Sequence, residues 1–163
     1  MKTLVRISAV LSWFNLVVGS YLVLSGLYGA FMVHDMRIML TVFVFIGAIV
    51  LHSYAAIQLR RSLLHPARPL SRETPLGIRF IGFIALFCSI MFVTSGTFIL
   101  RNAAELASQI TLPFDTKNFD VKSILPGMGI FILIYGITIA VNVIINLRLL
   151  KWYQAPMKDS SPK

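Results

Sequence analysis

Four long stretches without a charged residue divide this chain. No Asp, Glu, Lys or Arg occurs in residues 7–33, 38–59, 80–100 or 123–147, runs of 21 to 27 residues. Crossing a hydrocarbon core of about 30 Å takes about 20 helical residues. In lipid each backbone N–H and C=O must be bonded within its own segment, and the runs lack the alternation of a β-barrel. The pattern therefore predicts an all-α, polytopic membrane protein with an antiparallel four-helix transmembrane bundle.

The composition agrees with one membrane domain. The 163 residues are 57% hydrophobic and 13% charged, whereas soluble domains carry about a quarter charged residues. We expect helices over about 4–32, 37–63, 75–106 and 124–152, within one compact domain over 1–153. Asp35 is placed to cap the second helix after a tight turn. The polar composition of residues 154–163 predicts a disordered cytoplasmic tail.

The charged residues predict the orientation. Eleven basic and two acidic residues fall on the side that holds both termini and the middle loop, which accounts for the whole net charge of +9. The other side carries four of each sign. An excess of Lys and Arg marks the cytoplasmic face, so both ends are expected inside, in a membrane taken to be the bacterial cytoplasmic membrane. These cations are not accompanied by aromatic or polar side chains that could stack on bases or bond to them, which argues against nucleic-acid binding.

Five residues inside the predicted spans are candidates for a ligand site or polar cluster: Asn15, His52, Cys88, Tyr135 and Asn142. Four of them lie six to nine residues from the arginine that bounds their helix, which is a similar depth; Tyr135 lies on the same helix as Asn142. Unpaired polar groups are costly in hydrocarbon, so they should face the bundle interior. Either Asn15, His52 and Asn142 bond to one another and fix the helix register, or these residues line a small pocket or water-accessible cavity.

The spans contain too few suitable residues for a metal site, a haem site, an ion-coupling site or a nucleophilic site. One intramembrane histidine and one cysteine are too few ligands for a zinc site, and bis-histidine haem needs a second buried histidine. Proton or cation coupling usually leaves an acidic residue inside the membrane, and the spans have none. Cys88 would need a neighbouring base such as His52 to act as a nucleophile. We expect no metal and no cofactor, and no residue set indicates an enzyme.

Small and polar residues recur at helical spacing and mark the faces where helices pack. The first helix carries Ser8, Ser12, Asn15, Gly19 and Gly26 in such a stripe. The residues predicted to contact anionic lipid headgroups or a protein partner are Arg60, Arg61, Arg68, Arg72 and Arg79.

Two functions are compatible with these features. The first is a non-enzymatic accessory or interaction module that packs against a second copy or a larger membrane partner. The alternative is a small oligomeric transport or channel subunit, with a polar pathway lined by Asn15, His52, Tyr135 and Asn142.

Overall fold

The computed structural model describes residues 2–65, 70–71, 73–110 and 121–159. Within them the chain is helical and contains no strand, in the order α1 (Lys2–Met32), α2 (Met36–Thr41), the π-helix η1 (Val42–Ile46), α3 (Gly47–Leu64), α4 (Thr74–Gln109) and α5 (Val121–Asp159). Four spans are long and apolar enough to cross a membrane: Thr3–Met32, Met36–Leu64, Thr74–Gln109 and Val121–Ala155. The predicted all-α character and the four spans are confirmed.

Contacts divide the chain into two compact units. The first unit comprises Met1–Cys88 and Thr138–Lys163, and the second comprises Ser89–Ile137. The single domain over residues 1–153 that the sequence predicts stays a prediction. The helices α4 and α5 contribute to both units: residues 74–88 and 138–159 belong with α1–α3, whereas the rest of each helix belongs to the second unit.

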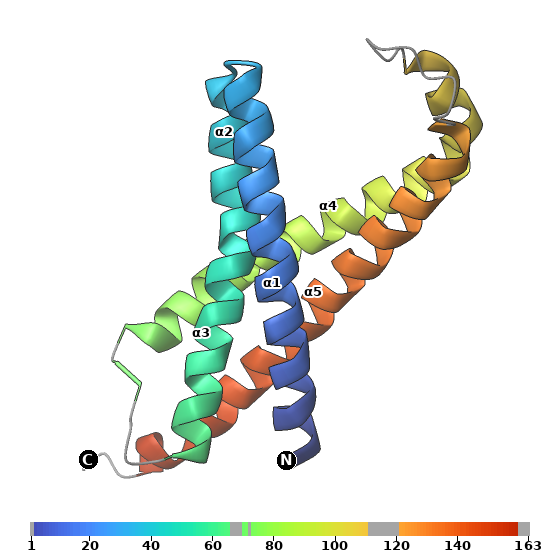
Figure 1. Cartoon of the computed structure of the whole chain (residues 1–163). Helices are drawn as coiled ribbons and strands as arrows, with labels where there is room; N and C mark the ends of the chain where they lie inside the picture. Colours follow the sequence, from blue (N-terminus) through green and yellow to red (C-terminus); the bar gives the residue numbers. More distant parts are fainter. Residues whose placement is uncertain (1, 66–69, 72, 111–120, 160–163) are drawn as a thin grey trace. The chain divides into compact units, whose positions relative to one another are not determined.

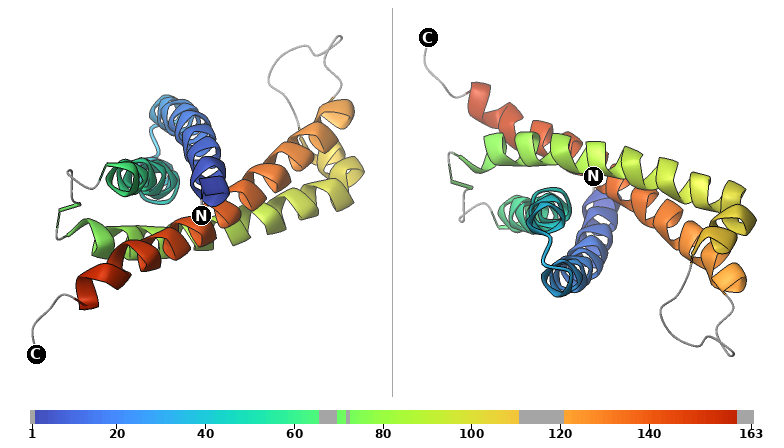
Figure 2. Two further views of the ribbon diagram at one scale, coloured as in Figure 1. Left: turned by 90° about the horizontal axis from the view of Figure 1, so that it is seen from below. Right: turned by 90° about the horizontal axis from the view of Figure 1, so that it is seen from above.

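A helical hairpin of α1 with α2, η1 and α3 forms one part of the first unit, and its two arms run side by side in Figures 1 and 2. The turn places His34 at φ 52°, in the left-handed region. Asp35 then caps α2, since its carboxylate accepts hydrogen bonds from the N–H groups of Arg37 at 2.8 Å and Ile38 at 3.4 Å. The predicted cap is confirmed, and the hairpin is closed by local chemistry.

The second arm contains a π-helical turn. The Gly47 N–H reaches back to the Val42 carbonyl, five residues earlier, which widens the helix locally. At this turn the arm approaches α1 closely, because a Cβ at Gly26 would lie 3.0 Å from Val42 Cγ1. The Cys88 thiol of α4 also donates to the Phe45 carbonyl within the turn, at 3.4 Å. A thiol on another helix thus bonds to a carbonyl of the irregular turn.

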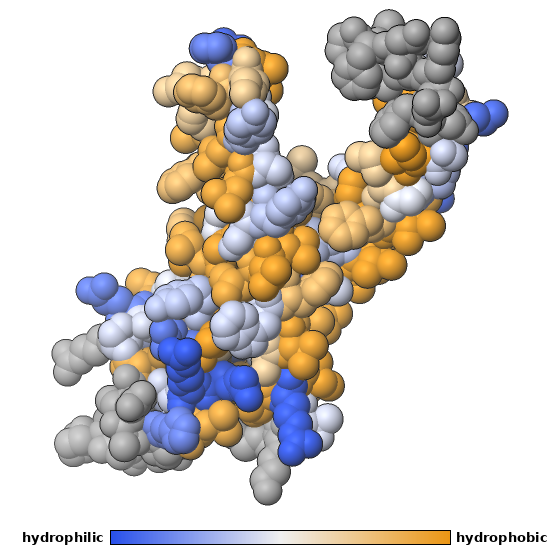
Figure 3. All heavy atoms as spheres, in the orientation of Figure 1, coloured by the Kyte–Doolittle hydropathy of each residue, from blue (hydrophilic) through white to orange (hydrophobic). Residues whose placement is uncertain are grey.

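An apolar cluster joins all four spans at one end of the first unit. Its buried members are Val5 of α1, Leu59 of α3, Ile78 of α4, and Leu149 and Leu150 of α5. A basic residue directly follows or precedes each of these residues in the sequence, so cations gather at this end of the unit. We call this the basic end; its described cations are Arg6, Arg60, Arg61, Arg79, Arg148 and Lys151. Figure 3 shows strongly hydrophilic side chains gathered near the start of α1 and the end of α3.

In the second unit, α4 and α5 pack closely at glycines. A Cβ at Gly96 would lie 2.7 Å from the Leu133 backbone nitrogen, and one at Gly136 would lie 3.0 Å from the Ser89 carbonyl oxygen. The Ser89 hydroxyl donates to the Gly136 carbonyl at 2.8 Å. Such close backbone approach at small residues is how membrane helices gain van der Waals contact. Beyond this contact α4 kinks at Asn102, whose φ of −115° and ψ of 21° are not helical.

The helix bounds differ from the sequence-based ranges mainly at α5. This helix begins at Val121 and continues to Asp159, whereas the sequence places its ends near 124 and 152. Residues 154–159 of the expected disordered tail are therefore helical, and residues 160–163 lie outside the described residues.

Candidate functional site: a buried polar seam

Polar side chains of α1 and α5 pair in the first unit. The Ser8 hydroxyl donates to Asn146 Oδ1 at 2.7 Å, and the Ser12 hydroxyl donates to Asn142 Oδ1 at 3.0 Å. The Thr138 hydroxyl donates to Asn15 Oδ1 at 3.1 Å. We call Ser8, Ser12, Asn15, Thr138, Asn142 and Asn146 the polar seam. As the α1 numbers rise the α5 numbers fall, so the two helices run in opposite directions along it.

The seam is also bonded along α5. Asn146 Nδ2 donates to the Asn142 backbone carbonyl at 2.8 Å and to Asn142 Oδ1 at 2.9 Å. Asn142 Oδ1 therefore accepts from both Ser12 and Asn146. Farther along, Asn15 Nδ2 donates to the Thr138 carbonyl at 3.4 Å. Each amide is thus oriented by at least two bonds, which fixes the register of α1 on α5.

The seam is closed to solvent. The exposed fractions of Asn15 and Asn146 are 0%, and those of Ser8, Ser12 and Asn142 are 1%. Only Thr138 is half-buried. Because polar groups in hydrocarbon are stabilised only when bonded, this arrangement satisfies them by mutual pairing without water.

His52 is buried but lies outside the hydrogen-bonded seam. Its side chain is 1% exposed, and neither ring nitrogen has a hydrogen-bond partner among the described residues. The ring fits against a gap left by Gly82 of α4, where a Cβ would lie 3.1 Å from His52 Cε1. The Ile78 carbonyl lies near the ring without reaching hydrogen-bond geometry.

The expectation that Asn15, His52 and Asn142 bond to one another is therefore wrong. All three are buried, but Asn142 bonds to Ser12 and Asn146, and His52 bonds to neither asparagine. The physical reason is the helix register, which aligns the α1 and α5 stripes and turns His52 toward α4. Ser8 and Ser12 lie in the stripe that the sequence marks on the first helix, and Asn146 lies one helical turn from the candidate Asn142. The sequence does not indicate which helix faces that stripe.

The other two candidates, Cys88 and Tyr135, belong to different units. Cys88 is 3% exposed at the end of the first unit, and its thiol bonds to the Phe45 carbonyl. Tyr135 belongs to the second unit, where it is 1% exposed. Its ring contacts Phe92 edge-on at 5.6 Å and stacks on Phe131 at 6.1 Å between centroids. Cys88 thus bonds to the second arm of the hairpin, and Tyr135 packs against aromatic side chains of α4 and α5.

The candidate contact arginines differ in their surroundings. Arg61 and Arg79 are exposed, and Arg79 Nη2 donates to Gln154 Oε1 at 2.6 Å. Arg60 is half-buried, and its Nε is buried without a hydrogen-bond partner among the described residues. Arg68 and Arg72 lie outside the described residues. Two of the five arginines therefore present exposed cations at the basic end.

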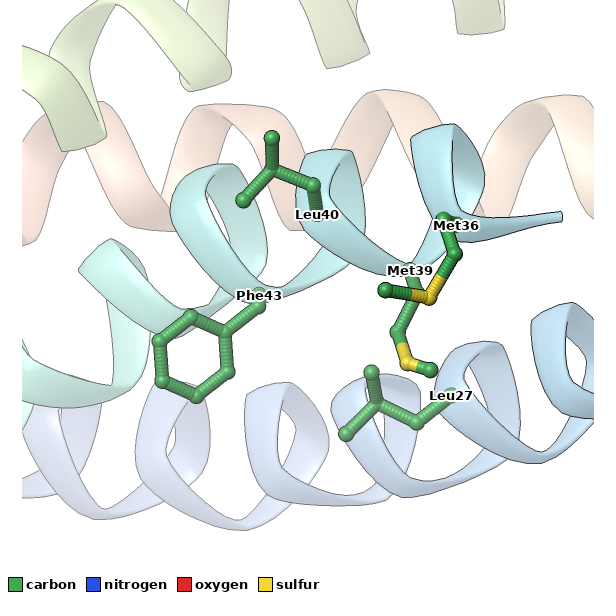
Figure 4. A pocket seen from close by; sticks show the side chains of 5 residues that line it. All are labelled: Leu27, Met36, Met39, Leu40 and Phe43. Carbon is green, nitrogen blue, oxygen red and sulfur yellow. The ribbon is translucent and has the colours of Figure 1, made fainter.

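The pocket between α1 and the second arm is lined by apolar side chains. It has a volume of about 320 Å³ and is lined by Leu27, Met36, Met39, Leu40 and Phe43, shown in Figure 4. The side chains that Figure 4 draws carry only carbon and sulfur, so they can contact an apolar group and nothing else. Within the described part of the chain, no three His, Cys, Asp or Glu side chains gather as metal ligands would.

Comparison of the chain with protein-family models, with curated proteins and with solved structures finds no match.

Proposed function

We propose that this protein is a non-enzymatic accessory or interaction module of a membrane, inserted with both termini and the α3–α4 connection in the cytoplasm. The proposed location is the bacterial cytoplasmic membrane. The spans supply the anchoring, and the one-sided charge of the sequence supports the orientation. The module uses its exposed helix faces and its basic end for contact with a second copy or a larger membrane partner.

The observation that carries this proposal is the closed polar seam. A transport pathway needs polar side chains directed at a continuous water-accessible line. Here Asn15, Asn142 and Asn146 are bonded within the protein and have exposed fractions of 1% or less. The polar groups of the seam are used for helix packing, which leaves the outer faces as the available surface.

Those outer faces are large and apolar. Tyr21 of α1 is 70% exposed and Phe83 of α4 is 73% exposed, among many exposed apolar side chains of the spans. Lipid covers such faces by default, so a partner would have to replace lipid on one of them. The proposal therefore requires that one face contact protein and another contact lipid.

Photo-crosslinking in intact membranes tests this requirement. A photoreactive phenylalanine analogue replaces Tyr21 or Phe83, one at a time, and crosslinked material is identified by mass spectrometry. We expect one defined protein, or a second copy of this chain, at one of the two positions and lipid at the other. Lipid adducts alone at both positions would contradict an interaction module.

The alternative of a small transport or channel subunit has one observation in its favour. His52 keeps two buried ring nitrogens without partners in the described structure, as a pathway residue could. Ion or solute flux into proteoliposomes of the purified chain separates the two functions. Flux that a His52→Leu substitution abolishes would support the alternative. Flux no higher than that into liposomes without protein would support the interaction module.

A further inference from the structure

A groove between α3 and α4 in the first unit has a mixed lining. Its volume is about 260 Å³. The apolar lining comes from Leu51 and Ala55 of α3 and from Ile78 and Ile81 of α4, and the polar lining from Tyr54, Gln58 and Thr74. Unlike the apolar pocket beside α1, this groove passes from aliphatic side chains to hydrogen-bonding ones as it approaches the basic end.

The polar part of the groove is organised. Gln58 Nε2 donates to the Tyr54 hydroxyl oxygen at 3.0 Å, which leaves the hydroxyl proton of Tyr54 to donate to another group. On the opposite wall, the Thr74 hydroxyl bonds to Ser71 at 2.6 Å where α4 begins. Tyrosine at this level is typical of the interface between hydrocarbon and headgroups.

A cation continues the same wall. The α3 residues of the groove, 51, 54, 55 and 58, follow helical spacing, and the next position on that face is Arg61. Arg61 is exposed and belongs to the basic end. The N-terminus of α4, which is the positive end of its helix dipole, borders the other wall at Thr74. The groove thus runs from an aliphatic half to a positively charged end.

We propose that this groove binds one anionic phospholipid. An acyl chain lies along Leu51, Ala55, Ile78 and Ile81, and the phosphate is held at Arg61 with a hydrogen bond from Tyr54. The occupant is a lipid because a free phosphate would leave the aliphatic half of the groove without a binding partner, whereas an acyl chain packs against it. It is anionic because a net negative headgroup complements Arg61 and the basic end. The site needs the spans in a bilayer but does not depend on the proposed protein partner.

Gly77 allows a direct test of the groove. It lines the groove, and a Cβ placed on it would meet nothing within 4 Å, so Gly77→Leu fills the groove without forcing the helices apart. Gly29 of α1 has the same open surroundings and is the matched control as Gly29→Leu. For the charge, Arg61→Gln is compared with Arg6→Gln, since Arg6 is an exposed arginine of the same basic end on α1.

Native mass spectrometry of the full chain from detergent measures occupancy by phosphatidylglycerol and by phosphatidylcholine with identical acyl chains. We expect Arg61→Gln to lower phosphatidylglycerol affinity about fivefold, the effect of one basic residue near a headgroup, with Arg6→Gln nearly unchanged. Gly77→Leu should remove the bound lipid, whereas Gly29→Leu should keep it.

Two results would overturn the site. Equal losses for Arg61→Gln and Arg6→Gln would mean a response to total charge, and full phosphatidylglycerol binding by Gly77→Leu would mean that lipid binds elsewhere. Melting temperatures of all four variants show that each is folded. Crosslinking at Tyr21 and Phe83 is read separately, so failure of the lipid site leaves the interaction module standing.

Discussion

At the scale of single residues, the two kinds of buried polar side chain predict opposite responses to substitution. Asn142 accepts two hydrogen bonds, whereas both ring nitrogens of His52 are buried without a partner in the described structure. Removing one partner of a buried bond leaves the other unsatisfied, but removing a group that makes no bond leaves nothing behind. Stability measurements on single variants therefore distinguish the bonded residues of the polar seam from the unbonded His52.

Replacing Ser12 with Ala should lower the free energy of unfolding by about 0.6 kcal/mol, the average for an interhelical hydrogen bond in a membrane protein. The loss is small because the free Asn142 oxygen still accepts from Asn146. Reversible unfolding in mixed micelles measures it. Ser25→Ala is the control on the same helix, since Ser25 is exposed and bonds only to the Leu22 carbonyl. A loss for Ser25→Ala equal to that for Ser12→Ala would contradict the seam.

Replacing His52 with Leu should leave the free energy of unfolding unchanged or raise it, because an apolar side chain of similar size avoids burying two unbonded nitrogens. Asn142→Leu is the matched comparison and should lower it by about 1–3 kcal/mol, since Ser12 and Asn146 lose their acceptor. The same unfolding assay serves both variants. A destabilisation by His52→Leu as large as that by Asn142→Leu would show that His52 is bonded.

At the scale of helices, the sequence predicts what depends on local composition. The charge-free stretches locate all four spans, and Asp35 marks the start of α2 by the chemistry of its side chain. The π-helical turn at Val42–Ile46 has no such signal, because a run of apolar residues permits either helix type. Its bond from Cys88 comes from a residue 43 positions away, which no local pattern indicates.

The glycine contact of the second unit gives a prediction for helix packing. Gly96→Ala should lower the free energy of unfolding by about 1–3 kcal/mol, since its Cβ would lie 2.7 Å from the Leu133 backbone nitrogen and the helices must separate. Gly127→Ala in α5 is the control, because a Cβ there meets nothing within 4 Å and alanine favours the helix. Thermal unfolding in detergent compares them. Equal melting temperatures for the two variants would contradict the close approach.

At the scale of the whole molecule, the candidate site is only partly predictable from the sequence. The first-helix stripe contains Ser8, Ser12 and Asn15 of the seam, and depth counting correctly selects Asn15 and Asn142 as buried. Neither tells which stripes meet, because the register is set by long-range packing such as that of Val5 with Leu149 and Leu150. Similar depth is therefore insufficient evidence for a shared site, as His52 demonstrates.

The proposed orientation makes a prediction for intact cells. In a Cys88→Ala background, a cysteine at exposed Ser108 should react with a membrane-impermeant maleimide from outside, whereas one at Gln154 should react only after permeabilisation. The reason is the charge distribution, with all the net charge of +9 on the side that holds Gln154. Labelling in the reverse pattern would place the basic end outside.

The polar seam is closed to water, and thiol labelling with a water-soluble reagent tests this closure. Single cysteines replace Ser12 or exposed Ser71 in a Cys88→Ala background, and a small charged methanethiosulfonate is applied to both sides of proteoliposomes. A thiol in a closed, packed seam cannot meet the reagent. We expect complete labelling at Ser71→Cys and none at Ser12→Cys from either side. Labelling at Ser12→Cys would reveal a water-filled pathway and overturn the closed seam.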